Sequence, residues 1–228
     1  MSSGPYVWKE RPLAAGIQIA VADFMAVHTA CGTIGCFVRQ RPKSGIAAAD
    51  NPPYLLTAGH VLMPQKKGGI TPVDQRVYQP APVGWINGVA STSEVHYEGS
   101  IDAGIALLDS DTGFRNYVWK IGDIKGIADP VDGMIVSKHG RTTGRTVGLV
   151  TMSSYTYGGF HDLFQITFNA DDPANNSSRF GSEGDSGAPI MTGDGLLVGI
   201  LHAVDEDGSG GYACKISNIF DAMRLSLA

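Results

Sequence analysis

The 228-residue chain has few charged residues, only three cysteines and no long apolar run. Charged side chains make up 17 % of it, and acidic residues outnumber basic ones by 22 to 17. Because neutralising phosphates requires clustered lysine and arginine, this balance argues against a nucleic-acid partner. No apolar stretch approaches the length that a membrane-spanning helix requires. We therefore expect a protein that binds neither nucleic acid nor a membrane.

The cysteine count and the first residues bear on the cellular compartment. Cys31, Cys36 and Cys214 cannot all pair within one chain, whereas small secreted proteins usually carry an even set of disulfides. The first ten residues contain no apolar core of the kind found in signal peptides. We therefore expect a cytoplasmic protein, although a precursor cleaved before Met1 would fit the same residues. Cys31 and Cys36 are expected to lie on one strand, where they pack.

Glycine and proline are abundant instead, with 30 and 12 residues, and 43 % of the chain is hydrophobic. This composition favours many short strands separated by turns, and the length suffices for two cores of about a hundred residues each. Short apolar or alternating segments recur at the spacing typical of β-sandwiches and β-barrels. They are Gly32–Arg39, Tyr54–Thr57, Arg76–Gln79, Gly88–Glu94, Ile101–Leu108, Met134–Lys138, Thr146–Met152, Leu163–Phe168, Pro189–Met191, Leu196–Ala203 and Gly211–Lys215. The sequence thus predicts an all-β fold.

Two segments depart from this strand pattern. Asp109–Asp132 alternates weakly and is expected to link two halves of the chain. Ser217–Leu227 spaces its apolar residues in a mixed helical pattern, which predicts a C-terminal helix with Ser217 as its N-cap. Arg41 to Asn51 is rich in breakers and predicts the loop of a long hairpin between the first two strands.

A histidine and an aspartate stand beside two of the predicted strands. His60 ends the apolar segment Leu55-Leu-Thr-Ala-Gly-His60, and Asp102 precedes another in Ser100-Ile-Asp102-Ala-Gly. Titratable side chains at such places are candidates for catalysis only when further groups support them. Taken alone, the histidine fits a packed core residue and the aspartate fits a turn.

A serine bracketed by glycines is the more specific signal. In Gly184-Asp185-Ser186-Gly187 the glycines permit a loop with unusual backbone angles. Such a loop can direct successive N–H groups into one concavity, where those of Gly184 and Ser186 would stabilise a developing oxyanion. The simpler alternative is a glycine-rich turn with an incidental serine.

Three segments together, in the order His, Asp, Ser, resemble the chymotrypsin-like, or trypsin-like, serine peptidases. They are Thr57-Ala-Gly-His60, Asp102-Ala-Gly-Ile-Ala and Gly184-Asp185-Ser186-Gly187. Two more segments, Gly32-Thr-Ile-Gly-Cys-Phe-Val-Arg and Lys138-His-Gly-Arg-Thr-Thr-Gly144, are similar to those of compact, disulfide-poor bacterial members. The resemblance spans nearly the whole chain.

This resemblance implies two packed six-stranded antiparallel β-barrels followed by a C-terminal helix. Residues 1–115 would form the first barrel, with His60 and Asp102, and residues 116–228 the second, with Ser186. It further implies that His60 takes the proton of Ser186 during attack on a peptide carbonyl, while Asp102 fixes the ring tautomer. An acyl-enzyme would form, and water would release it. We expect a serine endopeptidase acting on protein or peptide substrates without a metal or organic cofactor.

Two other functions fit the same residues. A catalytically silent relative would use the cleft as a peptide-binding module. An esterase or acyl transferase would use the same nucleophile and oxyanion hole, because a fold and a triad do not fix the substrate. A regulatory protein partner is also expected, since no segment that keeps a cytoplasmic protease inactive is visible in the sequence.

The resemblance also places three residues at the substrate pocket. Phe180 falls at its floor, where digestive trypsins carry an aspartate, which argues against a preference for Lys or Arg. His202 falls on the strand of the pocket wall, as in relatives that select Glu or Gln, although a packed strand histidine is the alternative. Glu183 at the rim would repel a substrate carboxylate. Glutamine or a small apolar side chain would avoid that repulsion.

Asp185 needs a cationic partner if the oxyanion loop is to form without proteolytic activation. In the bacterial relatives a basic side chain near the Gly-x-Thr-Thr-Gly segment serves this purpose, and Lys138 stands at the matching position. We expect an ion pair between Lys138 and Asp185, with Arg141 as the substitute and a cluster of backbone N–H groups as the simpler alternative.

Overall fold

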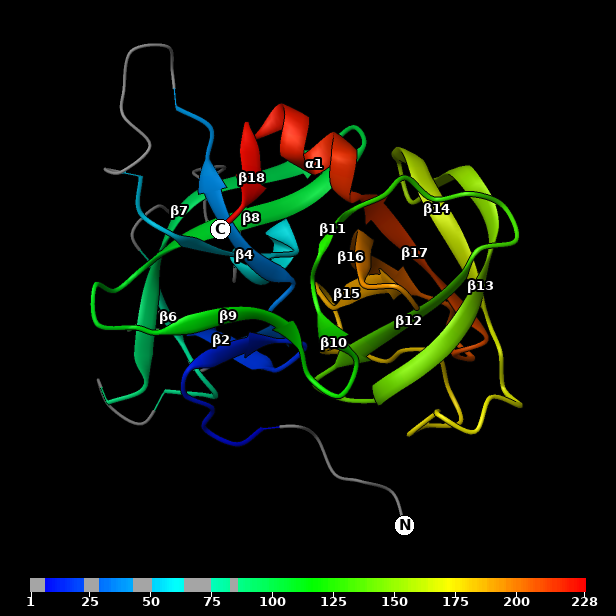
Figure 1. The fold of residues 1–228 in the computed structure, drawn as a ribbon, viewed down its shortest axis with the longest axis horizontal. Coiled ribbons are helices and arrows are strands. Elements are labelled where there is room, and N and C mark those ends of the chain that lie inside the picture. The colour runs from blue at the N-terminus through cyan, green and yellow to red at the C-terminus, as the bar shows by residue number, and fades with distance from the viewer. Residues whose placement is uncertain (1–6, 23–28, 43–50, 64–74, 83–85) are drawn as a thin grey trace.

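The structure is a computed structural model that describes residues 7–22, 29–42, 51–63, 75–82 and 86–228. Its described residues form strands, one short 3-10 helix and one α-helix. Two β-rich halves lie side by side, the earlier part of the chain in one and the later part in the other (Figure 1). The all-β class predicted from composition and strand spacing is confirmed.

The strands follow the predicted segments closely along most of the chain. In chain order the elements are β1 (Leu13–Ala15), β2 (Gln18–Ala22), β3 (Thr29–Thr33), β4 (Cys36–Gln40), β5 (Tyr54–Thr57), η2 (Gly59–Val61), β6 (Arg76–Tyr78), β7 (Gly88–Glu98), β8 (Ile101–Leu108), β9 (Phe114–Val118), β10 (Gly122–Asp123), β11 (Gly126–Ile127), β12 (Ile135–Gly140), β13 (Gly144–Tyr157), β14 (Phe160–Phe168), β15 (Pro189–Thr192), β16 (Leu196–Val204), β17 (Gly210–Lys215), α1 (Ile216–Ala222) and β18 (Leu225–Leu227).

The first half is a curled sheet of eight strands. Their order is β18-β4-β5-β8-β7-β6-β2-β3, and the described strands at its two edges do not pair with each other. The sheet encloses a core that includes Phe37, Leu55 and Ala106, all fully buried. β4 and β5 pair antiparallel as the predicted hairpin, although most of the loop predicted over 41–51 lies outside the described residues. The first half therefore differs from the expected six-stranded closed barrel.

The second half is a closed six-stranded barrel. The order β16-β15-β12-β13-β14-β17 closes because β16 also pairs with β17, and β11 adds to β16 in parallel. Phe164, Ile190 and Leu201 belong to its core and are almost entirely buried. Together with the curled first sheet, this barrel gives the predicted double-barrel architecture.

The last elements join the two halves. α1 contacts β8 in the first half and β16 and β17 in the second (Figure 1). β18 then pairs antiparallel with β4, with Leu225 opposite Gln40. The C-terminal helix was predicted, but it ends at Ala222 rather than Leu227, and Lys215, not Ser217, is its N-cap residue. The C-terminal residues thus complete the sheet of the first half.

Two further expectations need correction. The segment 109–132 is not a bare linker, because it contains β9, β10 and β11, and β9 pairs in parallel with β1. Cys31 and Cys36 lie on different strands, β3 and β4. The chain turns between them at Gly35, where an added Cβ would lie 3.0 Å from the carbonyl oxygen of Gly187. A side chain there would push the two halves apart.

No helix in the described part of the chain is long and apolar enough to cross a membrane.

Candidate active site

His60 and Asp102 meet in the first half of the molecule. His60 lies in η2, directly after β5, and Asp102 is the second residue of β8. The ring Nδ1 of His60 lies 2.6 Å from Asp102 Oδ2, and the backbone N–H of His60 donates to Asp102 Oδ1 at 2.9 Å. Gly59 permits this approach, because an added Cβ would lie 2.4 Å from the carbonyl oxygen of His96. The carboxylate therefore holds both the ring and the backbone of His60.

A second histidine contacts the same carboxylate. His202 Nδ1 also lies 2.6 Å from Asp102 Oδ2. In β16 the pairing with β17 shifts between Leu201 and Ala203, so His202 is the extra residue of a β-bulge. Bulges redirect side chains, and this one points the ring at Asp102. The resemblance placed His202 on the wall of the substrate pocket. In the structure its ring contacts Asp102, the same carboxylate that His60 contacts.

Asp102 is fully buried and ionised. Burial alone would raise its pKa, but the hydrogen bonds from His202 and His60 outweigh burial and lower the pKa to about 2. Its own backbone N–H donates to Cys214 Sγ on β17 at 3.3 Å. Burial raises the pKa of Cys214 to about 12, so its thiol stays protonated near neutral pH. Asp102 thus provides a fixed negative charge behind the His60 ring.

The loop that carries Ser186 packs against the first half. Thr33 connects them twice, since its N–H donates to the carbonyl of Ser186 at 2.9 Å and its hydroxyl to that of Gly184 at 2.9 Å. Gly184 and Gly187 have φ angles of 93° and 87°, which favour glycine. A Cβ on Gly187 would lie 2.2 Å from Thr57 Oγ1. The serine loop is therefore held beside the strand that leads to His60.

The backbone N–H groups of this loop fall into two sets. Those of Asp185, Gly187 and Ala188 donate to backbone carbonyls. Within the described part of the chain, no hydrogen bond is made by the N–H of Gly184 or of Ser186. These two residues are the pair that the sequence predicts for an oxyanion hole.

Asp185 lies in a polar cluster within the second half. Its Oδ2 lies 3.4 Å from Lys138 Nζ, and both side chains are fully buried. Oδ2 also accepts from the hydroxyl of Thr143 at 2.6 Å, and Oδ1 accepts from the N–H of Thr142 at 2.8 Å. Burial lowers the pKa of Lys138, and the charge of Asp185 works against that shift. The structure thus places Lys138 beside Asp185, as the sequence suggested.

Arg141, the expected substitute, points elsewhere. Its Nε donates to Gln18 Oε1 at 2.6 Å, and its N–H donates to Thr33 Oγ1 at 3.1 Å. Arg141 therefore connects the second half to the first rather than neutralising Asp185.

The two other residues assigned to the pocket have different surroundings. Phe180 is fully buried in the core of the second barrel, with its ring centroid 5.6 Å from Lys138 Nζ. Glu183 is exposed, and its carbonyl accepts from the hydroxyl of Thr142. A Cβ on Gly181 would lie 2.6 Å from Val204 Cγ1. Val204 therefore covers the segment after Phe180, and Phe180 has no exposed surface.

Sequence reasoning did not single out Thr33, Thr143 or Cys214. Thr33 and Thr143 lie inside two of the quoted segments, those that begin at Gly32 and at Lys138, so these segments contained a signal for them. Cys214 lies in no quoted segment, because its importance comes from a contact with Asp102 between the two halves.

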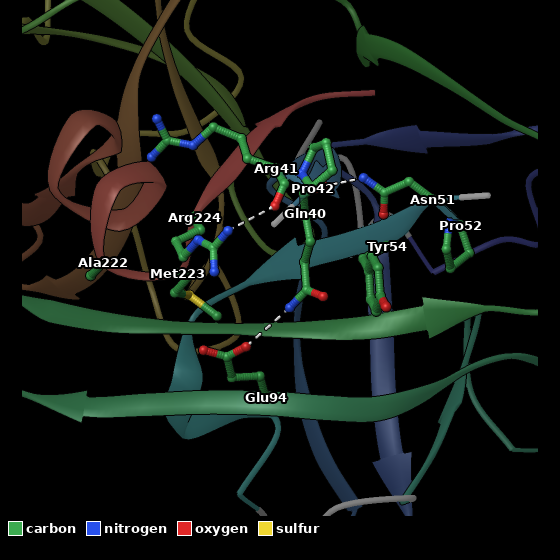
Figure 2. Close-up of a pocket in the computed structure, with 10 residues that line it drawn as sticks. All are labelled: Gln40, Arg41, Pro42, Asn51, Pro52, Tyr54, Glu94, Ala222, Met223 and Arg224. Carbon is green, nitrogen blue, oxygen red and sulfur yellow. Dashed lines mark hydrogen bonds between the residues drawn. The ribbon is translucent and has the colours of Figure 1, made fainter. Parts of the chain in front are cut away.

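A separate pocket of about 550 Å³ lies away from the catalytic candidates. Figure 2 shows it between β4, β7 and the segment that joins α1 to β18. Gln40 crosses it to donate to Glu94 at 3.2 Å, and Arg224 donates to the carbonyl of Arg41 at 3.3 Å. The contact of Arg224 fastens the C-terminal segment to the first sheet.

Comparison with known proteins gives matches to solved structures alone. No protein-family model matches the chain, and no curated protein matches it. A protease from Nocardiopsis superposes with a TM-score of 0.66 at 17 % identity, over 94 % of this chain and 97 % of that one. Protease A from Thermobifida fusca gives 0.65 at 18 % identity, over 95 % and 99 %.

A third similar structure is described as a glutamic acid specific serine protease that uses a histidine triad in substrate binding. It superposes with a TM-score of 0.64 at 17 % identity, over 95 % of this chain and all of that one. Likeness at this level of identity establishes architecture. The chain therefore has the chymotrypsin-like double-barrel fold of bacterial serine proteases.

Proposed function

We propose that this chain is a serine endopeptidase in which Ser186 is the nucleophile, His60 the general base and Asp102 the residue that orients the base. The observation that carries the proposal is the pair of uncommitted N–H groups of Gly184 and Ser186, on a loop held beside the His60–Asp102 pair. Such donors stabilise negative charge that develops on a carbonyl oxygen. The arrangement suits acyl transfer from a peptide.

The proposed mechanism follows from the proton positions. An ionised carboxylate only accepts hydrogen bonds, so Asp102 keeps the His60 proton on Nδ1 and leaves a lone pair on Nε2. Nε2 takes the hydroxyl proton as Ser186 Oγ attacks the carbonyl carbon. The same proton then passes to the leaving amine, and the acyl-enzyme remains. Water, deprotonated by His60, attacks the ester, and His60 returns the proton to Ser186 Oγ as the acid product leaves.

The imidazolium formed during attack is stabilised by Asp102. Asp102 is buried and the His60 side chain is 36 % exposed. The ring therefore has a fixed negative charge on one side and solvent on the other. The buried Lys138–Asp185 pair supports the loop without any proteolytic activation. The proposed enzyme would therefore be active as folded.

A preference for small uncharged side chains before the cut bond is the finer part of the proposal. Val204 covers Gly181, and Phe180 is sealed in the core, so a long side chain would meet atoms in that direction. The exposed Glu183 disfavours an acidic side chain by repulsion. His202 is engaged with Asp102, which leaves it unsuited to select Glu or Gln.

Labelling with a fluorophosphonate tests the nucleophile. We expect an adduct on Ser186 of the folded chain, and none on Ser186→Ala or on urea-unfolded protein. The same Ser186→Ala variant should lose at least about a thousandfold in kcat for peptide cleavage, because the triad acts as a unit. Absence of an adduct on the folded chain would favour the silent peptide-binding module.

Profiling cut sites in a peptide library tests the substrate. Cleavage after alanine, glycine or serine is expected, and cleavage after glutamate would contradict the assigned pocket. A chain that is labelled but hydrolyses only esters would be the esterase or acyl transferase.

Location and regulation complete the proposal. We propose a cytoplasmic protease, supported by Cys31, Cys36 and Cys214, which are free thiols in the structure. A regulatory protein would then restrain it. Unchanged activity of the purified chain after addition of a cytoplasmic extract would argue against such a partner, and recovery from a secreted fraction would contradict the location.

A further inference from the structure

Three side chains that can bind a metal ion converge behind the proposed general base. The Nδ1 atoms of His60 and His202 each lie 2.6 Å from Asp102 Oδ2. Within the part of the chain that the structure describes, these residues form the one group of three histidine, cysteine or acidic side chains whose ligand atoms all lie within 4.8 Å of one another. We propose that they form an inhibitory site for Zn²⁺ or a similar transition-metal ion. The inhibition rests on the proposed function, whereas the metal site does not.

The chemistry of the three ligand atoms suits zinc. Two imidazole nitrogens and one carboxylate oxygen are ligands that Zn²⁺ accepts, and they leave a fourth position for water. Mg²⁺ and Ca²⁺ prefer sites built of oxygen atoms alone, so imidazole ligands select against them. Asp102 supplies the negative charge that attracts a cation to this place. The site should therefore discriminate between transition-metal ions and the common hard cations.

The spacing of the ligand atoms is close to that around a bound ion. With bonds of about 2.0–2.1 Å, neighbouring ligands of a tetrahedral zinc ion lie about 3.3–3.4 Å apart. The two Nδ1–Oδ2 distances are 2.6 Å, so each must lengthen by about 0.7–0.8 Å when an ion replaces the hydrogen bonds. A shift of this size is within the reach of side-chain rotation. The three residues can therefore bind an ion without any change in the backbone.

The surroundings fix one side of the site and open the other. The His202 side chain is 8 % exposed, and its ring centroid lies 4.6 Å from that of Phe160. Asp102 Oδ1 accepts the backbone N–H of His60 at 2.9 Å, and such a contact orients a metal-binding carboxylate. The His60 side chain is 36 % exposed. An ion can therefore enter from the His60 side, where water provides the fourth ligand.

An ion at this site disables the general base through its tautomer. In the structure His60 donates from Nδ1 and keeps its lone pair on Nε2. An ion bonded to Nδ1 uses the lone pair of that atom, so the neutral ring carries its proton on Nε2 instead. The Nδ1 proton passes to water, and Nε2 takes one from water, so the ring neither gains nor loses a proton overall. Nε2 then cannot accept the proton of Ser186, and attack on a carbonyl carbon stops.

Cobalt(II) tests the site without any reaction. Co²⁺ accepts the same ligands as Zn²⁺ but binds them less tightly, and its visible absorption strengthens when its coordination becomes tetrahedral. We expect Ser186→Ala without an affinity tag to bind one equivalent of Co²⁺ with a tetrahedral spectrum. Zn²⁺ should abolish this spectrum, and Mg²⁺ should leave it unchanged.

Three substitutions locate the ion, each made in the Ser186→Ala chain. His60→Asn and His202→Asn each remove one ligand and should weaken Co²⁺ binding about tenfold to a hundredfold or more. His96→Asn is the matched control, because His96 contacts a different carboxylate, that of Glu94, at 2.8 Å. It should leave the Co²⁺ affinity unchanged.

Fluorophosphonate labelling of Ser186 tests the inhibition. In the chain with Ser186 intact, saturating Zn²⁺ should slow labelling about a hundredfold or more, because the general base is lost, and EDTA should restore the rate. His202→Asn should need about 10–100 times more Zn²⁺ for the same fractional inhibition, whatever its own labelling rate is. His96→Asn should respond to Zn²⁺ as the unsubstituted chain does.

The outcomes separate this inference from the proposed function. A tetrahedral Co²⁺ spectrum in a chain that never labels at Ser186 would support the metal site and contradict the protease. Normal labelling in a chain without that spectrum would overturn the inference and leave the protease standing. Unchanged Co²⁺ affinity in both His60→Asn and His202→Asn, or Co²⁺ binding with no effect of Zn²⁺ on labelling, would also overturn it. Urea unfolding verifies each variant, and the partly exposed His60 provides the test if His202→Asn fails to fold.

Discussion

The two halves each bury a carboxylate, but they compensate it differently. Asp102, in the first sheet, receives two hydrogen bonds from His60 in its own half and one from His202 in the other. Among the described residues, the Asp185 side chain in the second barrel accepts hydrogen bonds only from groups of its own half, including Lys138 and Thr143. The compensation of the Asp185 charge is therefore local to its half, whereas the charge behind His60 depends on how the halves dock.

Removing the negative charge of Asp185 should lower the free energy of unfolding more than the other substitutions proposed here. Asp185→Asn leaves the fully buried Lys138 without its anionic partner. Breaking such a pair costs about 3–5 kcal/mol, because the remaining charge stays desolvated. Urea unfolding measures the loss, and fluorophosphonate labelling should fall with it.

A double variant sharpens this prediction. Lys138→Met combined with Asp185→Asn removes both charges and should recover most of the lost stability. If the single variant is as stable as the unsubstituted chain, the compensation of Asp185 is not local to this pair.

Loss of a contact between the halves should cost somewhat less. Thr33→Val keeps the shape of a fully buried side chain but removes the hydroxyl that bonds to Gly184 and Arg141. Leaving the buried carbonyl of Gly184 and the part-buried N–H of Arg141 unpaired costs about 2–3 kcal/mol. Thr33→Ser keeps the hydroxyl and is the matched control. Equal stability of the two variants would show that the hydroxyl does not fasten the halves.

A third prediction concerns the pH dependence of stability at another contact between the two halves. His139 of the second barrel donates from Nδ1 to the carbonyl of Gly16 in the first half, and burial lowers its pKa to about 4. The unfolded chain binds a proton below about pH 6.5, and the folded chain does so only near pH 4. The contribution of neutral His139 is thus complete above pH 6.5 and is lost as pH falls towards 4.

The size of this pH effect is measurable. Unfolding free energy should drop by about 2 kcal/mol more between pH 7 and pH 5 in the unsubstituted chain than in His139→Asn, which cannot titrate. Parallel losses in the two proteins would assign the pH dependence to other groups.

The smallest effect is expected at the surface. Arg41 and Asp221 form an ion pair at 3.0 Å between the first half and α1, but their side chains are 47 % and 80 % exposed. Exposed pairs contribute about 0–1 kcal/mol. Asp221→Asn should therefore change the urea midpoint little, with Ser226→Ala as a surface control. A loss above about 1 kcal/mol would mean that this pair also fastens the halves.

Much of the architecture could be predicted because the residues of most strands form a local pattern in the sequence. Ile101–Leu108 was predicted with the bounds that β8 has. The segment alternates little, but its apolar run between turn residues suffices for a strand. β18, by contrast, has three residues and exists only because β4 offers an edge to pair with. No local pattern in the sequence signals such an element.

The residues of the candidate site also differ in whether a local sequence pattern predicts them. The resemblance of short motifs led to His60, Asp102 and Ser186, which the structure places on adjoining segments. The role of His202 could not be read in this way, because alternation along a strand predicts faces only while the register is regular. The bulge between Leu201 and Ala203 breaks that register and turns His202 towards Asp102.

The pairing of β18 with β4 constrains the order of folding. Arg224 and Arg41, which flank this pairing, are 183 residues apart in the chain. Contacts that distant in sequence form slowly, because a large loop must close first. During synthesis on a ribosome, the first sheet must wait with an open β4 edge until the whole second barrel has been made. An unpaired edge is also where strands of other molecules can add, so this wait is a period of exposure to aggregation.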